Sequence, residues 1–301
     1  MNKILVIGSM GFVGSAAMRY YKDQGYVVTG CDVIDNDKTA DFIKVERKNP
    51  DYRTVFERIS PDFCLNASGA ANVPFSFENP FMDYELNVIN VMRMLEAIRL
   101  ISRETAFINI SSAAVYGTPS RLPVGEDADI TPISPYGWHK RQSEILCSEY
   151  AELYGLRICS MRVFSAYGPG LKKQLFWDLF QKTKMGKSVE LSGTGDESRD
   201  YIFVEDLVRA SEIIATKSLL KGEVINVATG IETTIREAVT IFIEVLGWDG
   251  GISFSGSKRK GDPLNWCAEI SKIKEMGFSS EFLLDAGLKR YCRWLRDLQQ
   301  L

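Results

Sequence analysis

The chain has little histidine and no paired cysteines. Of its 301 residues only His139 is a histidine, and the six cysteines are scattered without a Cys-x-x-Cys pair. Ligands this dispersed do not match the spacing of a metal site, so we expect no bound metal. They also exclude a disulfide framework, and we expect reduced, mostly buried thiols, as in a cytosolic protein.

The sequence also lacks long apolar runs and an excess of basic residues. No apolar run reaches about 18 residues, the length that a membrane-spanning helix needs, so we expect no membrane association. The first apolar run, residues 4–7, is predicted to be a strand. We therefore expect no signal peptide and a cytoplasmic location. A net charge of −3 does not indicate a basic surface for binding nucleic acid. An anionic substrate would therefore have to be bound by individual arginine or lysine side chains.

The residues that are present favour a mononucleotide-binding unit. The apolar run at residues 4–7 is typical of a buried parallel strand. Gly8, Gly11 and Gly14 follow it, a helical pattern comes next, and a second strand ends on Asp32. Strand, glycine turn, helix, strand and terminal acid together predict dinucleotide binding.

Each part of this unit has a physical role. The glycines allow a tight turn, a close approach of a pyrophosphate to the backbone, and close packing of the helix on the strand. The pyrophosphate would lie on free N–H groups at the helix N-terminus, where Phe12 and Val13 are found. Asp32 would accept hydrogen bonds from the ribose hydroxyls and repel a 2′-phosphate, which favours NAD over NADP.

Strands and helices then alternate as far as about residue 168. Expected strands are 41–45, 61–68, 105–110 and 156–163, and expected helices are 52–59, 81–100 and 136–155. This alternation predicts an α/β fold with a Rossmann-type doubly wound parallel sheet. We assign residues 1–168 to this NAD-binding domain, with a returning segment near residues 200–228.

The regular alternation is lost further along the chain. Residues 169–199 and 229–301 are expected to form a smaller, partly discontinuous C-terminal substrate-binding domain. The pattern over residues 189–203 predicts a hairpin there. Such a domain would cover the carboxyl edge of the sheet, where doubly wound folds bind ligands.

Tyr136 and Lys140 are the strongest candidates for catalysis. They are four residues apart on a predicted helix, so their side chains are neighbours. An ammonium near a phenol favours the phenolate, so we expect the pKa of Tyr136 to lie below its usual value of about 10. Tyr136 would then be a usable base. Ser112 lies on the loop between the preceding strand and this helix.

These motifs resemble the extended short-chain dehydrogenase/reductase superfamily, and in particular its UDP-galactose 4-epimerase-like nucleotide-sugar epimerases and dehydratases. The resemblance runs from residue 3 to about residue 272. It implies that Ser112, Tyr136 and Lys140 form a catalytic triad, with NAD as cofactor and a nucleotide-diphosphate sugar as substrate. It also implies a homodimer, formed through the helices that contain residues 81–100 and 136–154.

The resemblance further assigns binding residues. For the cofactor it implies contacts, beyond the glycine loop and Asp32, from Ala67, Ser68, Asn87, Ser111, Tyr136 and Lys140. For the substrate it implies Ser112 and two phosphate-binding arginines: Arg199 in an Arg-Asp-Tyr block and Arg259 in an Arg-x-Gly-Asp block.

Two further residues bear on the sugar. Ser165 stands where the family usually has an asparagine that contacts the substrate. Cys267 stands where a small residue is associated with room for a 2-N-acetyl group, although a buried small hydrophobic residue is an equally good interpretation.

Trp138 and His139, inside the Tyr-x-x-x-Lys motif, are expected to serve packing or a subunit interface.

Two alanines restrict the reaction. Family members that remove water carry Asp-Glu after the catalytic hydroxyl, and here those positions are Ala113 and Ala114, neither of which can move a proton. The remaining prediction is an NAD-dependent 4-epimerase acting on a UDP-hexose or UDP-N-acetylhexosamine, with polysaccharide biosynthesis as the expected pathway. A nucleotide-sugar 4-dehydrogenase or 4-keto reductase stays an alternative, and so does a non-catalytic NAD-binding regulator.

Overall fold

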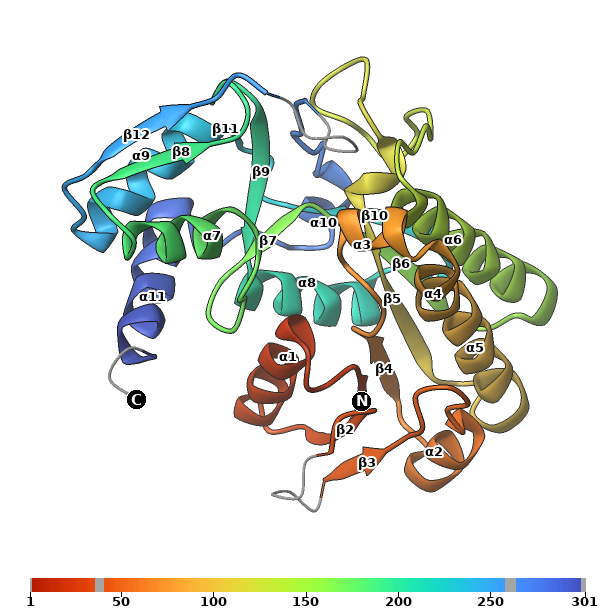
Figure 1. Cartoon of the computed structure of the whole chain (residues 1–301). Helices are drawn as coiled ribbons and strands as arrows, with labels where there is room; N and C mark the ends of the chain where they lie inside the picture. The colour runs from red at the N-terminus through yellow and green to blue at the C-terminus, as the bar shows by residue number, and fades with distance from the viewer. Residues whose placement is uncertain (1, 36–40, 258–263, 299–301) are drawn as a thin grey trace.

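A parallel sheet of seven strands forms the centre of the larger part of the molecule (Figure 1). The computed structural model describes residues 2–35, 41–257 and 264–298. In spatial order the strands are β10 (Lys221–Val227), β6 (Ile158–Val163), β5 (Ala106–Ser112), β4 (Phe63–Asn66), β1 (Lys3–Ile7), β2 (Val27–Asp32) and β3 (Phe42–Lys44). The predicted doubly wound α/β fold is confirmed.

Helices cover both faces of this sheet. Ile4 and Val6 of β1 pack with α1 (Phe12–Asp23) and α8 (Val204–Lys217). Their neighbours Leu5 and Ile7 pack with the helices of the opposite face. Those helices are α2 (Tyr52–Ile59), α5 (Asn90–Ile101) and α6 (Pro135–Tyr154). Successive side chains of a strand point to opposite faces, so an uninterrupted apolar run is what a sheet covered on both sides requires.

The strand order changes direction beside β1. β2 and β3 lie to one side of it, and β4, β5, β6 and β10 lie to the other. In an open α/β sheet the crevice for ligands lies at the carboxyl ends of the strands where this reversal occurs. The glycine loop follows β1 at that place, and the turn after β4 lies next to it.

The smaller part of the molecule contains two short sheets. One has the order β11 (Glu232–Thr234), β9 (Ser198–Phe203), β7 (Ser165–Tyr167), and the other pairs β12 (Gly251–Phe254) with β8 (Ser188–Leu191). They pack with α7 (Gln174–Thr183), α9 (Ile235–Leu246) and α11 (Leu284–Asp297), and α10 (Ser271–Glu275) lies near β10. The aromatic side chains Tyr167, Phe176, Phe242 and Tyr291 meet in this second core.

The predicted hairpin over residues 189–203 is wrong. β8 pairs in parallel with β12, and β9 pairs with β7 and β11, so the two strands belong to different sheets. Their partners lie far along the chain in both directions. A local alternation of apolar residues cannot reveal such partners, because it fixes the strand but not its neighbour.

The helix predicted over residues 81–100 is present, because helical backbone runs without a break through residues 80–101, but the turn at residues 85–89 is π-helical. The chain forms α3 (Val73–Glu78), α4 (Pro80–Tyr84), a π-helical turn η1 (Glu85–Ile89) and then α5. Asn87 is buried within the π-helical turn. Such turns interrupt α-helices frequently at functional sites, and here the turn presents an amide inside an otherwise apolar stripe.

The cysteines are as predicted. All six lie within the described residues, are buried and remain unpaired. In the portion of the chain that the structure describes, no helix is long and apolar enough to cross a membrane.

Candidate active site

The glycine loop is closed so tightly that two of its residues must be glycine. A side chain on Gly8, whose φ is +81°, would place its Cβ 2.7 Å from backbone atoms of Ala67 and Ser68. A Cβ on Gly14 would lie 2.0 Å from the carbonyl oxygen of Gly8. The turn therefore sets the N-terminus of α1 against the turn after β4.

The start of α1 has the properties of an anion site. Gly11 is the N-cap residue and supplies no side-chain cap, and Phe12 and Val13 begin the helix. The first N–H groups of a helix have no partner within the helix, and they carry its positive end. No acidic residue lies in the first turn of α1 to oppose a phosphate.

Asp32 lies at the end of β2, directly beside this loop. Its Oδ2 accepts a hydrogen bond from the N–H of Met10 at 2.9 Å, and its Oδ1 accepts from Val33 and Ile34 at 2.7 and 3.1 Å. The carboxylate is thus fixed by backbone donors. A carboxylate has about four lone-pair positions, so it keeps acceptor capacity for a ribose.

Orphaned polar atoms show that the site fits a polar ligand. Both side-chain amide atoms of Asn87 are buried without a partner, and so is the hydroxyl of Ser9. A Cβ on Gly69 would lie 2.5 Å from Asn87 Oδ1, so the amide faces the turn after β4, where Ser68 also lies. Buried polar atoms without partners are rare. The glycine loop, which has no side chains at Gly8 and Gly14, Asp32 and the unpartnered polar atoms of Asn87 and Ser9 together fit a dinucleotide.

Ser111, which we expect to contact the cofactor, uses its side chain within the fold. Its hydroxyl is buried and donates a hydrogen bond to Glu144 Oε1 at 2.7 Å. The side chain is therefore engaged inside the fold, where it joins β5 to α6, and only the backbone of Ser111 is left to contact a cofactor.

Ser112, Tyr136 and Lys140 come together at the carboxyl end of β5. Ser112 ends the strand and accepts a hydrogen bond from the N–H of Ala114 at 3.1 Å, which begins the 3-10 turn η2 (Ala113–Tyr116). A Cβ on Gly137 would lie 2.5 Å from the Ala114 carbonyl oxygen. The first turn of α6 therefore packs directly on η2, and this contact brings Tyr136 close to the Ser112 hydroxyl, which acts to lower the Tyr136 pKa.

Lys140 occupies the next turn of α6. Its Nζ donates a hydrogen bond to the carbonyl oxygen of Ile110 at 2.8 Å and lies 5.9 Å from the centre of the Tyr136 ring. Pro135 and the side chain of Ser134, which accepts from the N–H of Gly137, fix the start of the helix. The predicted adjacency of the tyrosine and the lysine is therefore present.

The predicted direction of the Tyr136 pKa is wrong for the protein alone. Burial raises the pKa of Tyr136 to about 12, although the nearby Ser112 hydroxyl acts in the opposite direction. Burial lowers the pKa of Lys140 to about 8, against the nearby carboxylates of Asp83 and Glu144. Removal from water disfavours the charged form of both groups, and this effect is the largest cause of both shifts.

This burial predicts that Lys140→Met stabilises the protein in the absence of ligands. The native chain releases the Lys140 proton near pH 8 and the unfolded chain near 10.5, so the cost of burying the charge is fully present below pH 8. We expect a gain of about 1–2 kcal/mol at neutral pH. Denaturant unfolding would measure it, with exposed Lys172→Met as the control. A lower midpoint for Lys140→Met alone would contradict the prediction.

Two buried carboxylates near the triad were missed in the sequence. Asp83 of α4 and Glu144 of α6 are both fully or almost fully buried. A signal existed for Glu144, since it lies four residues after Lys140 and eight after Tyr136, on the same helix face. Asp83 lies four residues before Asn87, and an acid at that spacing within an apolar stripe marks a buried polar cluster.

Two of the expected substrate residues lie on short strands beyond the main sheet. Ser165 begins β7, and Arg199 lies on the neighbouring strand β9. Arg199 Nη1 donates to the carbonyl oxygens of Ser198 and Leu264 at 2.7 and 3.1 Å, and its guanidinium lies 5.6 Å from the centre of a Trp266 ring. Arg259 lies outside the described residues.

The segment that contains Cys267 links this region to the triad. The indole N–H of Trp266 donates to the Gly117 carbonyl oxygen at 3.1 Å, directly after η2. Cys267 is the next residue and is buried. Burial, with the charges of Asp200 and Glu232, raises the pKa of its thiol to about 11, so the thiol stays protonated at neutral pH.

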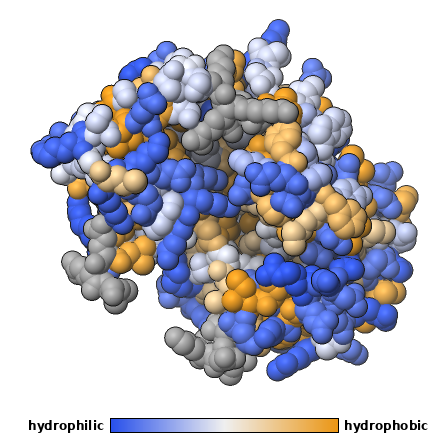
Figure 2. Space-filling view, viewed as in Figure 1, coloured by the Kyte–Doolittle hydropathy of each residue, from blue (hydrophilic) through white to orange (hydrophobic). Residues whose placement is uncertain are grey.

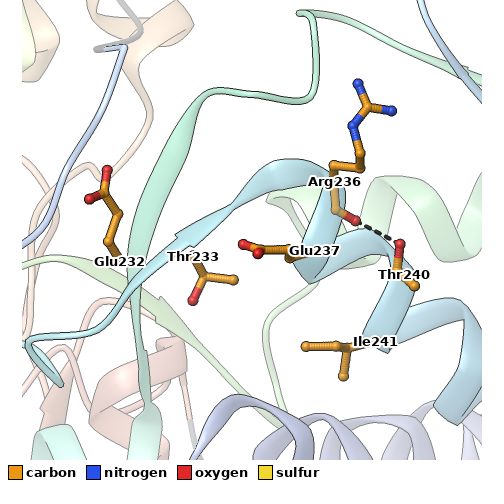
Figure 3. Close-up of a pocket in the computed structure, with 6 residues that line it drawn as sticks. All are labelled: Glu232, Thr233, Arg236, Glu237, Thr240 and Ile241. Atoms are coloured by element: carbon orange, nitrogen blue, oxygen red, sulfur yellow. Dashed lines mark hydrogen bonds between the residues drawn. The ribbon is translucent and has the colours of Figure 1, made fainter.

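A hollow of about 490 Å³ lies elsewhere, on the smaller part of the molecule (Figure 3). Its lining residues are Glu232, Thr233, Arg236, Glu237, Thr240 and Ile241. The polar groups there serve the fold: Glu237 closes a capping box with Thr234, and Thr240 donates to the Arg236 carbonyl oxygen. We assign no chemistry to this hollow.

Known proteins share this architecture over the whole chain. A putative UDP-glucose 4-epimerase from Methanocaldococcus jannaschii is 28% identical over 307 residues, covering 98% of each chain. A solved UDP-glucose 4-epimerase from Thermotoga maritima, with UDP-glucose, is 27% identical with a TM-score of 0.89 and 99% of each chain covered. A UDP-glucuronic acid 4-epimerase from Bacillus cereus, with UDP-glucuronic acid and NAD, is 27% identical with a TM-score of 0.88, covering 98% of this chain and 99% of that one.

The family model of NAD dependent epimerases and dehydratases matches residues 4–228, which include the glycine loop, Asp32, the triad and all seven strands of the main sheet. NAD is the cofactor of this family, and the loop and the orphaned amide of Asn87 fit it. The chain belongs to the NAD dependent epimerase/dehydratase family.

Proposed function

We propose that this protein is a UDP-sugar 4-epimerase that oxidises C4 of its substrate transiently and reduces it again. The observation that carries the proposal is the composition of the triad site: Ser112, Tyr136 and Lys140 lie together, while the residues that follow Ser112 are Ala113 and Ala114. Such a site can move the proton of one hydroxyl, but it offers no acid and base at this position for eliminating water. The two solved relatives named above are UDP-sugar 4-epimerases.

Tyr136, Ser112 and Lys140 each have a separate role at the C4 carbinol of the substrate. Bound NAD would supply the acceptor, and afterwards the donor, for the hydride of C4. The phenolate form of Tyr136 takes the proton of the 4-hydroxyl and gives it back, and the hydroxyl of Ser112 positions the oxygen of the sugar. Lys140 contacts the nicotinamide ribose, and its ammonium, held by the carbonyl oxygen of Ile110, favours the phenolate. Inversion requires the 4-keto sugar to turn over before the hydride returns.

The substrate assignment rests on the smaller part of the molecule. We assign residues 1–168 with a segment near 200–228 to NAD binding, and residues 169–199 and 229–301 to the substrate. Arg199 and Arg259 would bind the diphosphate, for which guanidinium groups are suited. Ser165 would contact the sugar. Cys267, a small side chain, would leave room for either a hexose or a 2-N-acetylhexosamine.

We further propose a homodimer in the cytoplasm that serves polysaccharide biosynthesis. Apolar side chains gather at the surface on the side where α4, α5 and α6 lie (Figure 2). The exposed members on these helices include Phe81, Met82, Met92, Trp138, Ile145 and Leu153. Single exposed apolar residues need no explanation, but a group on adjacent helices supports an interface. His139 differs from its neighbour Trp138, since it packs inside the chain against Asp83.

Replacing Asp32 by alanine is expected to weaken NAD binding about 10–100-fold, because a hydrogen bond to a charged group is worth about 1.5–3 kcal/mol. The loss of the negative charge should also reduce the discrimination against NADP. Titration of the variants with both cofactors would measure these effects, with exposed Asp23→Ala at the end of α1 as the control. Unchanged NAD affinity in Asp32→Ala would refute the assigned role.

The proposed function is tested by incubating the purified protein with UDP-, dTDP-, GDP- and CDP-sugars and no added cofactor. A new product of unchanged mass from a UDP-sugar is the expected result. A product formed only after NAD or NADH is added, with a mass change of two hydrogens, would favour a 4-dehydrogenase or 4-keto reductase instead. Loss of one water would contradict the interpretation of Ala113 and Ala114.

A further inference from the structure

The chain's single histidine makes a buried contact beside the triad. His139 Nδ1 donates a hydrogen bond to Asp83 Oδ2 at 2.5 Å, across the crossing of α4 and α6. Asp83 is fully buried, and the His139 side chain is 12% exposed. The ring of Tyr84 packs edge-on against the imidazole with 5.3 Å between ring centres. His139 lies between Tyr136 and Lys140 in the sequence, so the contact is made from the first turns of the catalytic helix.

Asp83 is incompletely satisfied for a buried carboxylate. Its second oxygen, Oδ1, is buried and has no hydrogen-bond partner. A buried carboxylate that lacks hydrogen bonds destabilises a fold, and a neutral residue of similar size would avoid this cost. Packing alone therefore does not explain an aspartate at this position.

The charge of Asp83 acts on both members of the catalytic pair. Burial is the main cause of the shifted pKa of Tyr136 and of Lys140, and beyond burial Asp83 raises the pKa of each. It thereby opposes the phenolate and favours the ammonium. The Asp83 carboxylate therefore favours the protonated form of both Tyr136 and Lys140.

The other ionisable groups around the pair are few in the described residues. Tyr84 lies on α4 itself, and Glu144 and Cys147 act on Lys140 from the following turns of α6. Glu78 of α3 and Glu85 of η1 have exposed side chains. Asp83 is thus the carboxylate whose charge acts on both Tyr136 and Lys140.

We propose that Asp83 and His139 form a positioning pair for the catalytic face of α6. The carboxylate sets the pH range in which Tyr136 and Lys140 exchange protons, and the imidazole N–H stabilises its charged form. The pair touches neither substrate nor cofactor and acts through Tyr136 and Lys140. This inference rests on the proposed 4-epimerase function.

The test is the pH profile of kcat/KM for the interconversion of a UDP-sugar. Asp83→Asn removes the charge and keeps the shape, so both limbs of the profile should move to lower pH, by about one unit. His139→Leu removes the one hydrogen-bond donor that the described residues give the buried carboxylate and so favours its neutral form, and the limbs should move to lower pH, as in Asp83→Asn. His139→Gln, which restores an N–H donor, should return the profile toward that of the wild type.

The double variant Asp83→Asn/His139→Leu keeps the test decisive if His139→Leu does not fold. It contains no unpaired charge, and its profile should match that of Asp83→Asn. Tyr84→Leu is the packing control, since it alters the contact with the imidazole without changing any charge of the pair. Limbs that stay at the wild-type pH in Asp83→Asn, or that move equally in Tyr84→Leu, would overturn the proposal.

A second measurement does not depend on turnover. Because the chain has one histidine, imidazole-labelled protein without an affinity tag gives one set of ring signals. We expect a protected, downfield N–H proton on His139 that is lost in Asp83→Asn, and its absence from the wild type would overturn the pair. A wild-type protein that shows this proton but converts no UDP-sugar would instead contradict the proposed function.

Discussion

Tyr136→Phe is expected to lower the rate of C4 interconversion by about 10²–10⁴-fold, the range for removing a positioned general acid or base. The variant loses only the phenol oxygen, which lies near the Ser112 hydroxyl. The ring still packs between η2 and Lys140, so the fold and NAD binding should be retained. Turnover of the UDP-sugar and the NAD content of the purified protein are the two measurements.

The matched control is Tyr154→Phe, at the opposite end of α6 and 38% exposed. It removes the same atom from the same helix, and we expect activity close to that of the wild type. A Tyr136→Phe variant that retains most of its activity would show that another group moves the proton of the 4-hydroxyl. A variant that has lost NAD as well would show that Tyr136 holds the cofactor rather than the proton.

Glu144→Ala is expected to destabilise the protein by about 3–5 kcal/mol, because it leaves a buried arginine without its counter-ion. Glu144 accepts two hydrogen bonds from Arg162, each at 2.9 Å, and both side chains are almost fully buried. Arg162 also donates to the phenol oxygen of Tyr116 at 2.9 Å and to the Glu126 carbonyl oxygen at 3.1 Å. Denaturant unfolding of the two proteins would measure the loss.

The double variant Glu144→Leu/Arg162→Met separates the charge from the packing. Buried ion pairs replaced by apolar side chains of similar volume often leave stability little changed. We therefore expect the double variant to be more stable than Glu144→Ala. Equal destabilisation of both variants would show that the geometry of the network, rather than the unpaired charge, determines the loss.

The sheet could be predicted from the sequence because each strand carries its own signal. The apolar run of β1 exists because both faces of the sheet are covered, and the turn and cap residues fix the ends of helices such as α2. The hairpin predicted over residues 189–203 failed because strand pairing depends on strands that lie elsewhere in the sequence. β8 and β9 are short, and their pairing with β12, β7 and β11 is decided by contacts that no local pattern contains.

In the candidate site, too, the sequence predicts local features but not those that depend on packing. The spacing of Tyr136 and Lys140 predicts that they are neighbours, and they are. It does not predict their burial, and burial reverses the expected direction of the Tyr136 pKa. Similarly, the family motif includes Ser111, but only the packing of α6 on β5 shows that its hydroxyl is engaged by Glu144.

The position of α8 has a consequence for the order in which the chain is synthesised. One face of β4, β5 and β6 is covered by α8, whose Leu207, Val208 and Ile214 lie in the same cluster as Phe63, Ile108 and Met161. The phenol of Tyr21 on α1 meets Ser211 on α8 at 2.6 Å. Six strands of the main sheet are complete when residue 163 leaves the ribosome, but this face stays bare until α8 follows. A nascent chain of that length therefore exposes apolar surface, and fragments that end there should aggregate.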